Sequence, residues 1–326
     1  MLIIMKPTKC ARNFILYFKS IFHNEKLISF KLLYSRCHEI QMEAFKKETV
    51  HIKDHDHVEE IVSQFVKGGA SKLQVIADFD YTLSRAHKDG VKCDTTYGIL
   101  KKAPFVPEDY KIQTTCLFEY YHPIEIDPNL TKVQKIPYMV EWYTKSLNLM
   151  PKSGIKKDQV PEMVESSNVQ LRDGCDVVFK SLHQHNVPLL IFSAGVGDLL
   201  KEVLRQKNML YPNMKIIANF MRFDEKDKLA GFKGAFIHTF NKNLTSVENS
   251  DYFNHLKSRD NIILLGDSLG DLDMTEGVND INSILRIGFL NHRIEEYLPE
   301  YLDAFDIVLT DDQTMDVLIG LLKNVL

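Results

Sequence analysis

Cysteine is scarce and scattered in this sequence. The chain has 326 residues and five cysteines, which are Cys10, Cys37, Cys93, Cys116 and Cys175. None of them forms a CxxC pair, and an odd number cannot all join in disulfides within one chain. The pattern therefore predicts free thiols in a reducing compartment, with no disulfide and no zinc knuckle.

The sequence also lacks an excess of positive charge and a long uninterrupted apolar run. Its 40 Lys and Arg residues face 44 Asp and Glu residues, which gives a net charge of -4. A nucleic-acid polymer needs a basic stripe, so this class of partner is disfavoured, although a small charged metabolite leaves no such footprint. Stable insertion into a membrane is not expected either. With 44% hydrophobic and 26% charged residues, the chain can bury a large core in more than one compact unit.

Residues 1–50 differ from the rest of the chain. Lys and Arg outnumber Asp and Glu there, and apolar residues such as Phe14, Phe18 and Phe22 lie among them. This composition also fits an organelle-targeting segment, a basic surface helix or a short signal anchor. Because no long apolar span is present, we favour a poorly ordered basic extension, and Met42 could be the functional start.

One stretch organises the remaining sequence. Residues 73–84, LQVIADFDYTLS, contain an apolar, β-branched run that ends in Asp78 and Asp80. Such a run predicts a buried parallel strand, and open α/β sheets bind ligands beyond the carboxyl ends of their strands. Taken alone, two acids one residue apart fit a solvated strand end equally well.

A second apolar run ends in the same way. Residues 262–273, IILLGDSLGDLD, place Asp267 and Asp271 after a predicted strand. Two buried strands that end in carboxylates bring like charges together, which is tolerable only with a cation between them. Every candidate ligand is a hard oxygen, and no Cys or His stands beside them, so the sequence predicts Mg²⁺.

Strands and helices alternate on both sides of a long interruption. The apolar periodicity predicts a helix before the first strand, a helix and strand pair after the interruption, and further strands and helices towards the C-terminus. The predicted helices are 58–66, 174–184, 293–301 and 315–325, and the predicted strands are 187–192, 214–218, 284–287 and 307–309. This order predicts an α/β fold with a parallel, Rossmann-like sheet.

Two places along this pattern could bind a phosphate group. Ser193 and Ala194 stand at a strand-to-helix turn, SAGVGDLL, where free backbone N–H groups favour an anion. A plain N-cap serine explains Ser193 as well. Lys242 follows a hairpin-rich segment, 220–240, and a surface lysine is its ordinary interpretation. A phosphate site built from carboxylates nevertheless needs a fixed cation beside its metal.

The interruption, from Arg85 to Arg172, is mainly helical or irregular, with a clear helical pattern at residues 140–150. An insertion of this size after the first strand predicts a cap that excludes water and contacts the non-reacting part of a substrate. Its aromatic residues fit an ordinary core, although some could stack on a base. They are Tyr120, Tyr121, Trp142 and Tyr143.

These motifs resemble a known family. DFDYTLS, the Ser193 turn, Lys242 and GDSLGD follow the order of the four motifs of the haloacid-dehalogenase (HAD) superfamily of phosphotransferases. YYHPIEIDP, PYMVEWYTKS, IFSAGVGD, GFKGAFIHTFNK and ILLGDSLGD are similar to the type III cytosolic 5′-nucleotidases, also called pyrimidine 5′-nucleotidases. The resemblance spans about residue 55 to the C-terminus. It implies a HAD-like core of residues 51–88 and 174–326 with a helical cap of residues 89–173.

The resemblance also implies a mechanism. Asp78 matches the nucleophile, which forms an aspartyl-phosphate, and Asp80 matches the general acid/base. Asp267 would bind Mg²⁺ directly together with Asp78 and the backbone carbonyl of Asp80. Asp271 would act through water or orient the other ligands. Lys242 would help to neutralise the phosphate dianion.

For the nucleobase, the resemblance points to two cap residues. Glu125 matches a glutamate that accepts a hydrogen bond from the base, and Ser146 matches a second cap contact. A surface acid before a turn is the plain alternative for Glu125, but a buried acceptor would discriminate strongly between bases. Many relatives carry an aromatic residue directly after the equivalent of Arg85, whereas this chain has Ala86 and His87. An aromatic residue that could stack on one face of the base is therefore missing at this position.

The cap also bears on which base is preferred. Relatives that favour 7-methylguanosine monophosphate usually carry two adjacent tryptophans where this chain has Trp142 and Tyr143. A cationic base is held best over an indole face, so Tyr143 points towards pyrimidine nucleotides. We expect CMP and UMP to be good substrates, 7-methylguanosine monophosphate to be turned over as well, and AMP and GMP to be poor.

We therefore predict a cytoplasmic, monomeric, Mg²⁺-dependent 5′-nucleotidase that acts on small nucleoside monophosphates. One alternative is a phosphatase or phosphotransferase of the same superfamily for another small phosphate ester. A second is a noncatalytic nucleotide-binding module, which loss of Asp78 or Asp80 would have indicated. Both acids are present.

Overall fold

The computed structural model describes residues 43–127, 129–243, 256, 258–278 and 280–326. The basic extension expected at residues 1–50 therefore lies mostly outside the described residues. The described residues from Glu43 onwards belong to one compact unit. Within the described part of the chain, no helix is both long enough and apolar enough to cross a membrane. Cys93, Cys116 and Cys175 carry free thiols.

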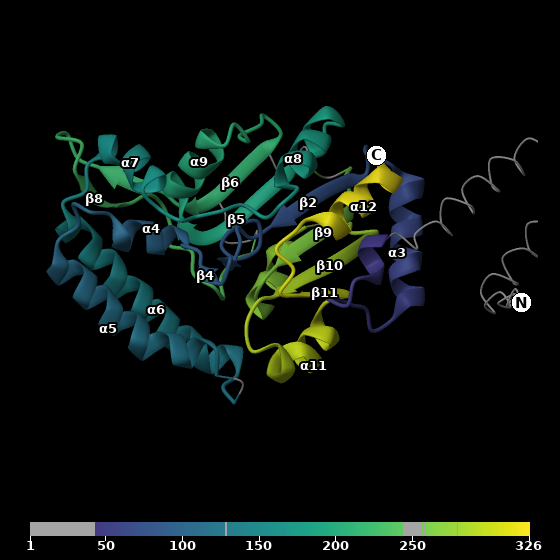
Figure 1. Ribbon diagram of the computed structural model, residues 1–326, viewed down its shortest axis with the longest axis horizontal. Coiled ribbons are helices and arrows are strands. Elements are labelled where there is room, and N and C mark those ends of the chain that lie inside the picture. The colour runs from purple at the N-terminus through teal and green to yellow at the C-terminus, as the bar shows by residue number, and fades with distance from the viewer. Residues whose placement is uncertain (1–42, 128, 244–255, 257, 279) are drawn as a thin grey trace, which may run out of the picture. The chain divides into compact units, whose positions relative to one another are not determined.

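A seven-stranded sheet forms the core (Figure 1). Its order is β1-β11-β10-β9-β2-β5-β6, and only β1 runs antiparallel to its neighbour. The strands are β1 Val50–His51, β11 Ile307–Thr310, β10 Ser283–Leu290, β9 Asn261–Gly266, β2 Leu73–Ala77, β5 Leu189–Val196 and β6 Met214–Asn219. The predicted α/β fold with a mostly parallel sheet is confirmed. The apolar runs of the sequence form its central strands, whose side chains are buried on both faces of the sheet.

Helices cover the sheet. Helix α3 spans His55–Gly68. Its N-cap is Asp54, whose side chain accepts a hydrogen bond from the His57 N–H, and its C-cap is Gly69, which has a φ of 60°. It packs against α12, Asp316–Val325, which also contacts α8, Cys175–Gln184. Helix α9, Gly197–Gln206, follows β5 directly, and α11, Ile294–Ala304, packs on β10 and β11. The loops after β2 and β9 lie at the carboxyl end of the sheet, and the loop after β9 contains a 3₁₀ helix, η5, Leu269–Thr275.

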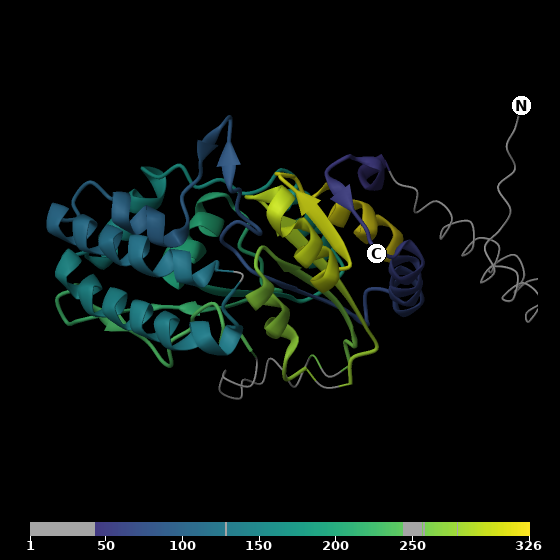
Figure 2. The same cartoon turned by 90° about the horizontal axis from the view of Figure 1, so that it is seen from below.

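The chain between β2 and α8 is mainly helical. A small hairpin comes first, β3 His87–Lys88 and β4 Val91–Lys92, and the helices that follow are α4 Thr96–Lys102, α5 Glu108–Glu125, α6 Lys132–Leu149 and α7 Val160–Glu165, with 3₁₀ turns η2 Met150–Ser153 and η3 Lys157–Gln159. Helices α5 and α6 lie side by side in both views (Figures 1 and 2). A capping box formed by Thr131 and Gln134 fixes the start of α6. The limits of the predicted cap, 89–173, remain a prediction.

A second small hairpin contacts this helical segment from later in the chain. Strands β7, Met221–Phe223, and β8, Leu229–Phe232, pair in an antiparallel manner. Strand β8 contacts both α6 and η2. Residues 233–243 lead from this hairpin back to the end of the sheet, so they connect the helical segment with the loops that follow the central strands.

Candidate active site

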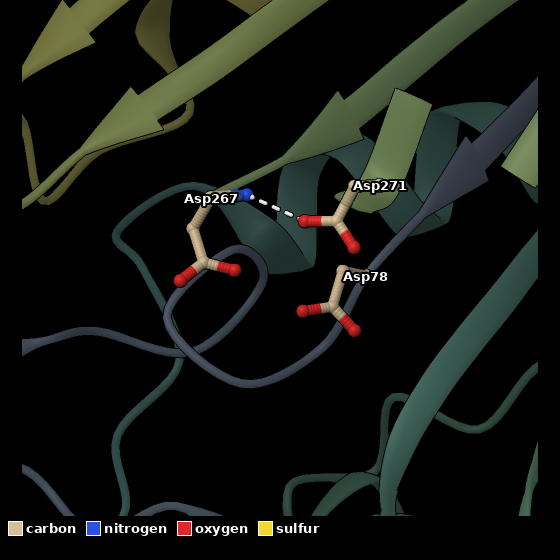
Figure 3. Close-up of side chains that lie close together, drawn as sticks. All are labelled: Asp78, Asp267 and Asp271. Carbon is tan, nitrogen blue, oxygen red and sulfur yellow. Dashed lines mark hydrogen bonds between the residues drawn. The ribbon is translucent and has the colours of Figure 1, made fainter. Parts of the chain in front are cut away.

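Three aspartates meet at the carboxyl end of the sheet. Strands β2 and β9 are parallel neighbours, with Ala77 opposite Leu265, and the Asp78 N–H donates to the Leu265 carbonyl at 3.0 Å. The loops after the two strands therefore begin side by side. Figure 3 shows the carboxylates of Asp78, Asp267 and Asp271 gathered in one place. Each offers an oxygen atom, and these three atoms lie within 4.8 Å of one another.

Lys242 lies between two of these acids. Its Nζ is 2.8 Å from Asp78 Oδ1 and 2.8 Å from Asp271 Oδ1, and all three residues are buried. Burial alone would lower the pKa of Lys242, but the charges of Asp271 and Asp78 together outweigh burial and raise this pKa above its usual range. The lysine is therefore a permanent cation in this site. One positive charge among three carboxylates leaves the cluster with an excess of negative charge.

Asp271 is tied to its own loop. Its Oδ2 accepts from the Asp267 N–H at 3.0 Å and from the N–H and hydroxyl of Ser268 at 2.9 and 3.0 Å. Gly266 allows this close approach, because a Cβ there would lie 2.5 Å from the Cβ of Asp271. Both carboxylate oxygens of Asp271 thus have protein partners. This arrangement suits a residue that orients Lys242 and the loop.

Asp267 has fewer partners and an unfavourable charge environment. Its Oδ1 accepts a hydrogen bond from the Thr82 hydroxyl at 3.3 Å, and its carbonyl accepts one from the Tyr301 hydroxyl at 2.6 Å. Burial raises its pKa well above the usual range, and the charges of Asp271 and Asp78 add to this effect. A carboxylate in this position becomes stable when a cation binds beside it. The cluster is thus suited to a divalent cation with oxygen ligands.

The two acids that follow β2 have different surroundings. Burial raises the pKa of Asp78 to about 6, with Lys242 opposing the shift and Asp271 adding to it. Burial also raises the pKa of Asp80 to about 7, although the residue as a whole is only half-buried. A carboxyl that titrates near neutrality can give up and take back a proton at physiological pH. Asp80 is therefore suited to acid–base work.

Ser193 and Ala194 lie at the end of β5, close to Asp80. Both are buried, and the Ser193 hydroxyl accepts from the Gly195 N–H at 2.9 Å. A Cβ on Gly195 would lie 3.0 Å from Ser193 Oγ and 2.9 Å from Asp80 Oδ2, so both side chains flank this glycine. Asn219 donates to the Ala194 carbonyl at 2.8 Å and holds the turn. The predicted phosphate-binding turn thus adjoins the predicted acid/base.

Glu125 lies at the C-terminal end of α5 and is tied to the core half of the site. Its Oε1 accepts from the Thr239 hydroxyl at 2.6 Å, and burial raises its pKa. The next carbonyl, that of Ile126, accepts from the Tyr297 hydroxyl on α11 at 3.0 Å. A half-buried acceptor is thus held where helix α5 meets the segment leading to Lys242.

Aromatic rings gather beside Glu125. The ring of Tyr143 on α6 lies 5.0 Å from that of Phe236, 6.2 Å from that of His238 and 6.3 Å from that of Tyr97. Ser146 lies about one turn further along α6 and is half-buried. The sequence predicted Tyr143 and Ser146 on this helix, whereas Phe236 and His238 come from the segment after β8. Planar rings of this kind can stack on a base.

Residues 85–87 form the stretch in which many members of the resembled family carry an aromatic side chain. In this protein the stretch contacts a different part of the molecule. Arg85 pairs with Asp173, and His87 pairs with Asp311 just after β11. Ala86 is buried, and its N–H donates to the Gln313 side chain at 3.1 Å. These contacts involve the chain after the helical segment and the C-terminal strand.

Comparisons with known proteins agree with this arrangement. Residues 81–326 match a family model described as Pyrimidine 5′-nucleotidase (UMPH-1). The chain is 46% identical over 286 residues to a 7-methylguanosine phosphate-specific 5′-nucleotidase of Homo sapiens, covering 88% of this chain and 95% of that protein. A Drosophila melanogaster protein with the same description is 40% identical, covering 84% of this chain and 86% of that protein.

The chain belongs to the pyrimidine 5′-nucleotidase family. A crystal structure of cytosolic 5′-nucleotidase IIIB bound to cytidine matches it with a TM-score of 0.79 and 40% identity, covering 87% of this chain and 96% of that one. A HAD-family hydrolase from Salmonella enterica serovar Typhi matches with a TM-score of 0.51 at 13% identity, covering 80% and 74%, which shows the fold alone. The predicted family, fold and enzyme class are confirmed.

Two residues that hold parts of the candidate site in place were not predicted from the sequence. Thr96, the first residue of α4, donates to both oxygens of Asp80. Arg172 is buried and donates to the carbonyls of Thr82 and Tyr81 at 2.7 and 2.6 Å, which fixes the loop after β2. The only sequence feature that could have drawn attention to Thr96 is the pair of threonines before a helix. No sequence feature distinguishes Arg172 from an ordinary surface arginine.

Proposed function

We propose that this member of the pyrimidine 5′-nucleotidase family hydrolyses CMP and UMP to nucleoside and phosphate in a Mg²⁺-dependent reaction. We propose further that it turns over 7-methylguanosine monophosphate and acts poorly on AMP and GMP. The observation that carries the proposal is the buried cluster of Asp78, Lys242 and Asp271, with Nζ 2.8 Å from each carboxylate. Burying these charges is costly, and a stable fold tolerates such a cost where the charges bind a ligand.

The residues present fit a magnesium ion. Asp78 and Asp267 would hold it through carboxylate oxygens and Asp80 through its backbone carbonyl, while Asp271 would act less directly. The charge excess of the cluster and the raised pKa of Asp267 support a cation at this position. When bound, Mg²⁺ neutralises the phosphate dianion and orients it for attack.

The chain's own residues then divide the reaction into two steps. Asp78 attacks phosphorus in line, and the bond to the 5′ oxygen breaks as the aspartyl-phosphate forms. Asp80 gives its proton to the departing oxygen. It then takes a proton from the water that hydrolyses the aspartyl-phosphate. Lys242 offsets the repulsion between carboxylate and phosphate, which is of order several kcal/mol, while Ser193 and the backbone of Ala194 bind phosphate oxygens.

The base would enter between Glu125 and the rings around Tyr143. Cytosine and 7-methylguanine both carry an exocyclic amino group, which can donate to the Glu125 carboxylate. A cytidine-bound relative and relatives specific for 7-methylguanosine phosphate support these two bases as candidates. The tyrosine at position 143 favours the pyrimidine, because the cationic purine gains less over a phenol ring than over an indole.

Asp78, Lys242, Asp267 and Glu125 are each held by contacts within a single copy of the chain. We therefore propose that the protein works as a monomer. We also propose that it works in the cytoplasm, in line with the description of one relative as a putative cytosolic 5′-nucleotidase 3 and with the scattered cysteines.

A phosphate-release screen tests this proposal. CMP, UMP, 7-methylguanosine monophosphate, AMP and GMP are each incubated with the protein, with and without Mg²⁺. We expect Mg²⁺-dependent release from the first three and little from the last two. Release only from a different phosphate ester would indicate a phosphatase of another specificity. Binding of nucleotide without any release would indicate a noncatalytic module.

A further inference from the structure

Thr96 engages Asp80 through two separate donors. Its backbone N–H donates to Asp80 Oδ1 at 2.9 Å, and its hydroxyl donates to Oδ2 at 2.7 Å. Thr96 is completely buried, so water does not replace either contact. Donors on both oxygens fix the plane of the carboxylate, which a single hydrogen bond would leave free to rotate.

The hydroxyl of Thr96 has a fixed direction. Its oxygen accepts from the Val196 N–H at 3.1 Å, so its single hydrogen is available for Asp80. Gly195 provides the space, since a Cβ there would lie 2.2 Å from Thr96 Oγ1. The hydroxyl therefore connects the acid/base with the phosphate-binding turn at the end of β5. It is bound on both sides and cannot turn away without breaking one of these contacts.

Thr96 is not needed to begin its helix. The preceding residue, Thr95, is the N-cap of α4, and its hydroxyl accepts from the Gly98 N–H at 3.1 Å. Capping is the common reason for a hydroxyl residue at a helix start. Since Thr95 performs that task, the side chain of Thr96 is left for Asp80 and Val196.

We propose that Thr96 is the positioning residue of Asp80 and that it favours proton donation to the leaving group. The inference rests on the role proposed for Asp80. In the first half-reaction the Asp78–phosphorus bond forms, the bond to the 5′ oxygen breaks, and the proton of Asp80 passes to that oxygen. Asp80 gains a full negative charge in this step. Two donors already aimed at its oxygens stabilise that charge as it develops.

The inference predicts a dependence on the leaving group. A nucleoside alkoxide needs a proton in order to leave, whereas nitrophenolate leaves without one. The ratio kcat/KM reports the first half-reaction, which ends with the aspartyl-phosphate. Thr96→Val, which removes the hydroxyl at nearly constant volume, should lower kcat/KM for CMP by about 30- to 100-fold, within the range of general acid catalysis. For p-nitrophenyl phosphate the loss should be less than about threefold.

Two further variants separate positioning from structure. Thr96→Ser keeps the hydroxyl and should restore kcat/KM for CMP to within about threefold of the unchanged protein. Thr95→Val is the matched control, because it removes a neighbouring hydroxyl that caps α4 without contacting Asp80. Any effect of Thr95→Val should be the same for both substrates.

A double-mutant cycle on CMP decides the case even if nitrophenyl phosphate is a poor substrate. Thr96→Val should cost little more once Asp80 is changed to Asn, because Thr96 acts through Asp80. Equal losses on both substrates, or full additivity with Asp80→Asn, would overturn the inference and leave the proposed nucleotidase function intact. If Thr96→Val does not fold, Thr96→Ala takes its place in the cycle. No Mg²⁺-dependent hydrolysis by the unchanged protein would instead contradict the proposed function.

Discussion

The two halves of the candidate site are built in different ways. At the end of the sheet, Asp271 and Lys242 are 0% and 4% exposed, and each has polar partners within 3.0 Å. On the helical side, α6 buries only Met139 completely along its length, and Tyr138 and Val140 are 41% and 47% exposed. The difference teaches that the charges proposed to surround phosphate lie in a fully buried core, while the surface proposed to surround the base lies on helices with few buried side chains. We expect changes in the first half to abolish turnover and changes in the second to redirect it.

The largest effect should follow from Asp78→Asn. This change removes the proposed nucleophile and a proposed metal ligand together, so phosphate release should fall by a factor of about 10³ or more. Steady-state assays on purified protein measure it, and a thermal melt establishes folding. Asp303→Asn, which alters an exposed acid on α11, is the matched control and should keep full activity. Substantial activity in a folded Asp78→Asn protein would remove Asp78 from its assigned role.

The next effect separates two acids of the same cluster. Asp267→Asn should raise the Mg²⁺ concentration for half-maximal activity at least about tenfold, whereas Asp271→Asn should change it less. The reason is that both oxygens of Asp271 already have protein partners. Titration of activity with Mg²⁺ measures both variants. Equal Mg²⁺ requirements in both variants and the unchanged protein would contradict the assignment.

Asp267→Asn should weaken Mg²⁺ binding but should stabilise the metal-free protein. The fold raises the pKa of Asp267 through burial and the charges of Asp271 and Asp78. The folded state thus binds this proton more tightly than the unfolded chain, so stability falls as pH rises through the folded pKa. Asp267→Asn carries no charge at any pH and should raise the metal-free Tm at pH 8 by about 2 °C or more. A lower Tm there would show that the carboxylate stabilises the fold.

On the helical side, Glu125→Gln should have a moderate effect that depends on the base. A neutral amide oxygen accepts a weaker hydrogen bond than a carboxylate, by about 1 kcal/mol, so kcat/KM for CMP should fall about five- to tenfold. Ribose 5-phosphate has no base, and its kcat/KM should not change. The Thr239 hydroxyl can still donate to the amide oxygen, which keeps the local structure intact. An equal loss on both substrates would place Glu125 in the chemistry rather than in base recognition.

The smallest effect is expected for Tyr143→Trp. An indole face holds the cationic methylated base better than a phenol ring by about 0.5 to 1 kcal/mol at a partly wet site. The ratio of kcat/KM for 7-methylguanosine monophosphate to that for CMP should therefore rise about two- to fivefold. Competition between the two nucleotides in one assay gives this ratio directly. A strong preference for the methylated nucleotide in the unchanged protein would show that Tyr143 does not select the base.

The sequence was informative where burial conflicts with charge. Asp78 and Asp267 stand out because an apolar strand that ends in an acid is unusual, and two such strands together point to one site. The partners of these acids were harder to find. Thr96 reaches Asp80 from 16 residues further along the chain, and Arg172 reaches the Thr82 carbonyl from 90 residues further along. Contacts of this kind leave no periodicity or spacing in the sequence.

The fold shows the same division. Apolar runs predicted the central strands, because strands covered on both faces have a distinctive composition. Strand order and strand ends depend on pairing, so β5 extends to Val196, beyond the predicted 187–192, and includes the turn predicted to bind phosphate. Phe236 and His238 reach Tyr143 only because the chain after β8 returns past α6. Their contribution to the base side could not be predicted without that path.

The position of Arg172 has a consequence for how the protein is made. A ribosome synthesises Asp78, the proposed nucleophile, before the arginine that fixes the loop after it, which comes about ninety residues later. Asn291, which donates to the Tyr81 carbonyl at 3.1 Å, and Asp312, whose carbonyl Arg172 also binds, are made more than a hundred residues after Arg172. Strand β2 has to wait for β9 as its neighbour. A nascent chain therefore has an open strand edge and an incomplete candidate site until β9 and Asp312 have been made, so chains that stop before them should be both inactive and prone to aggregate.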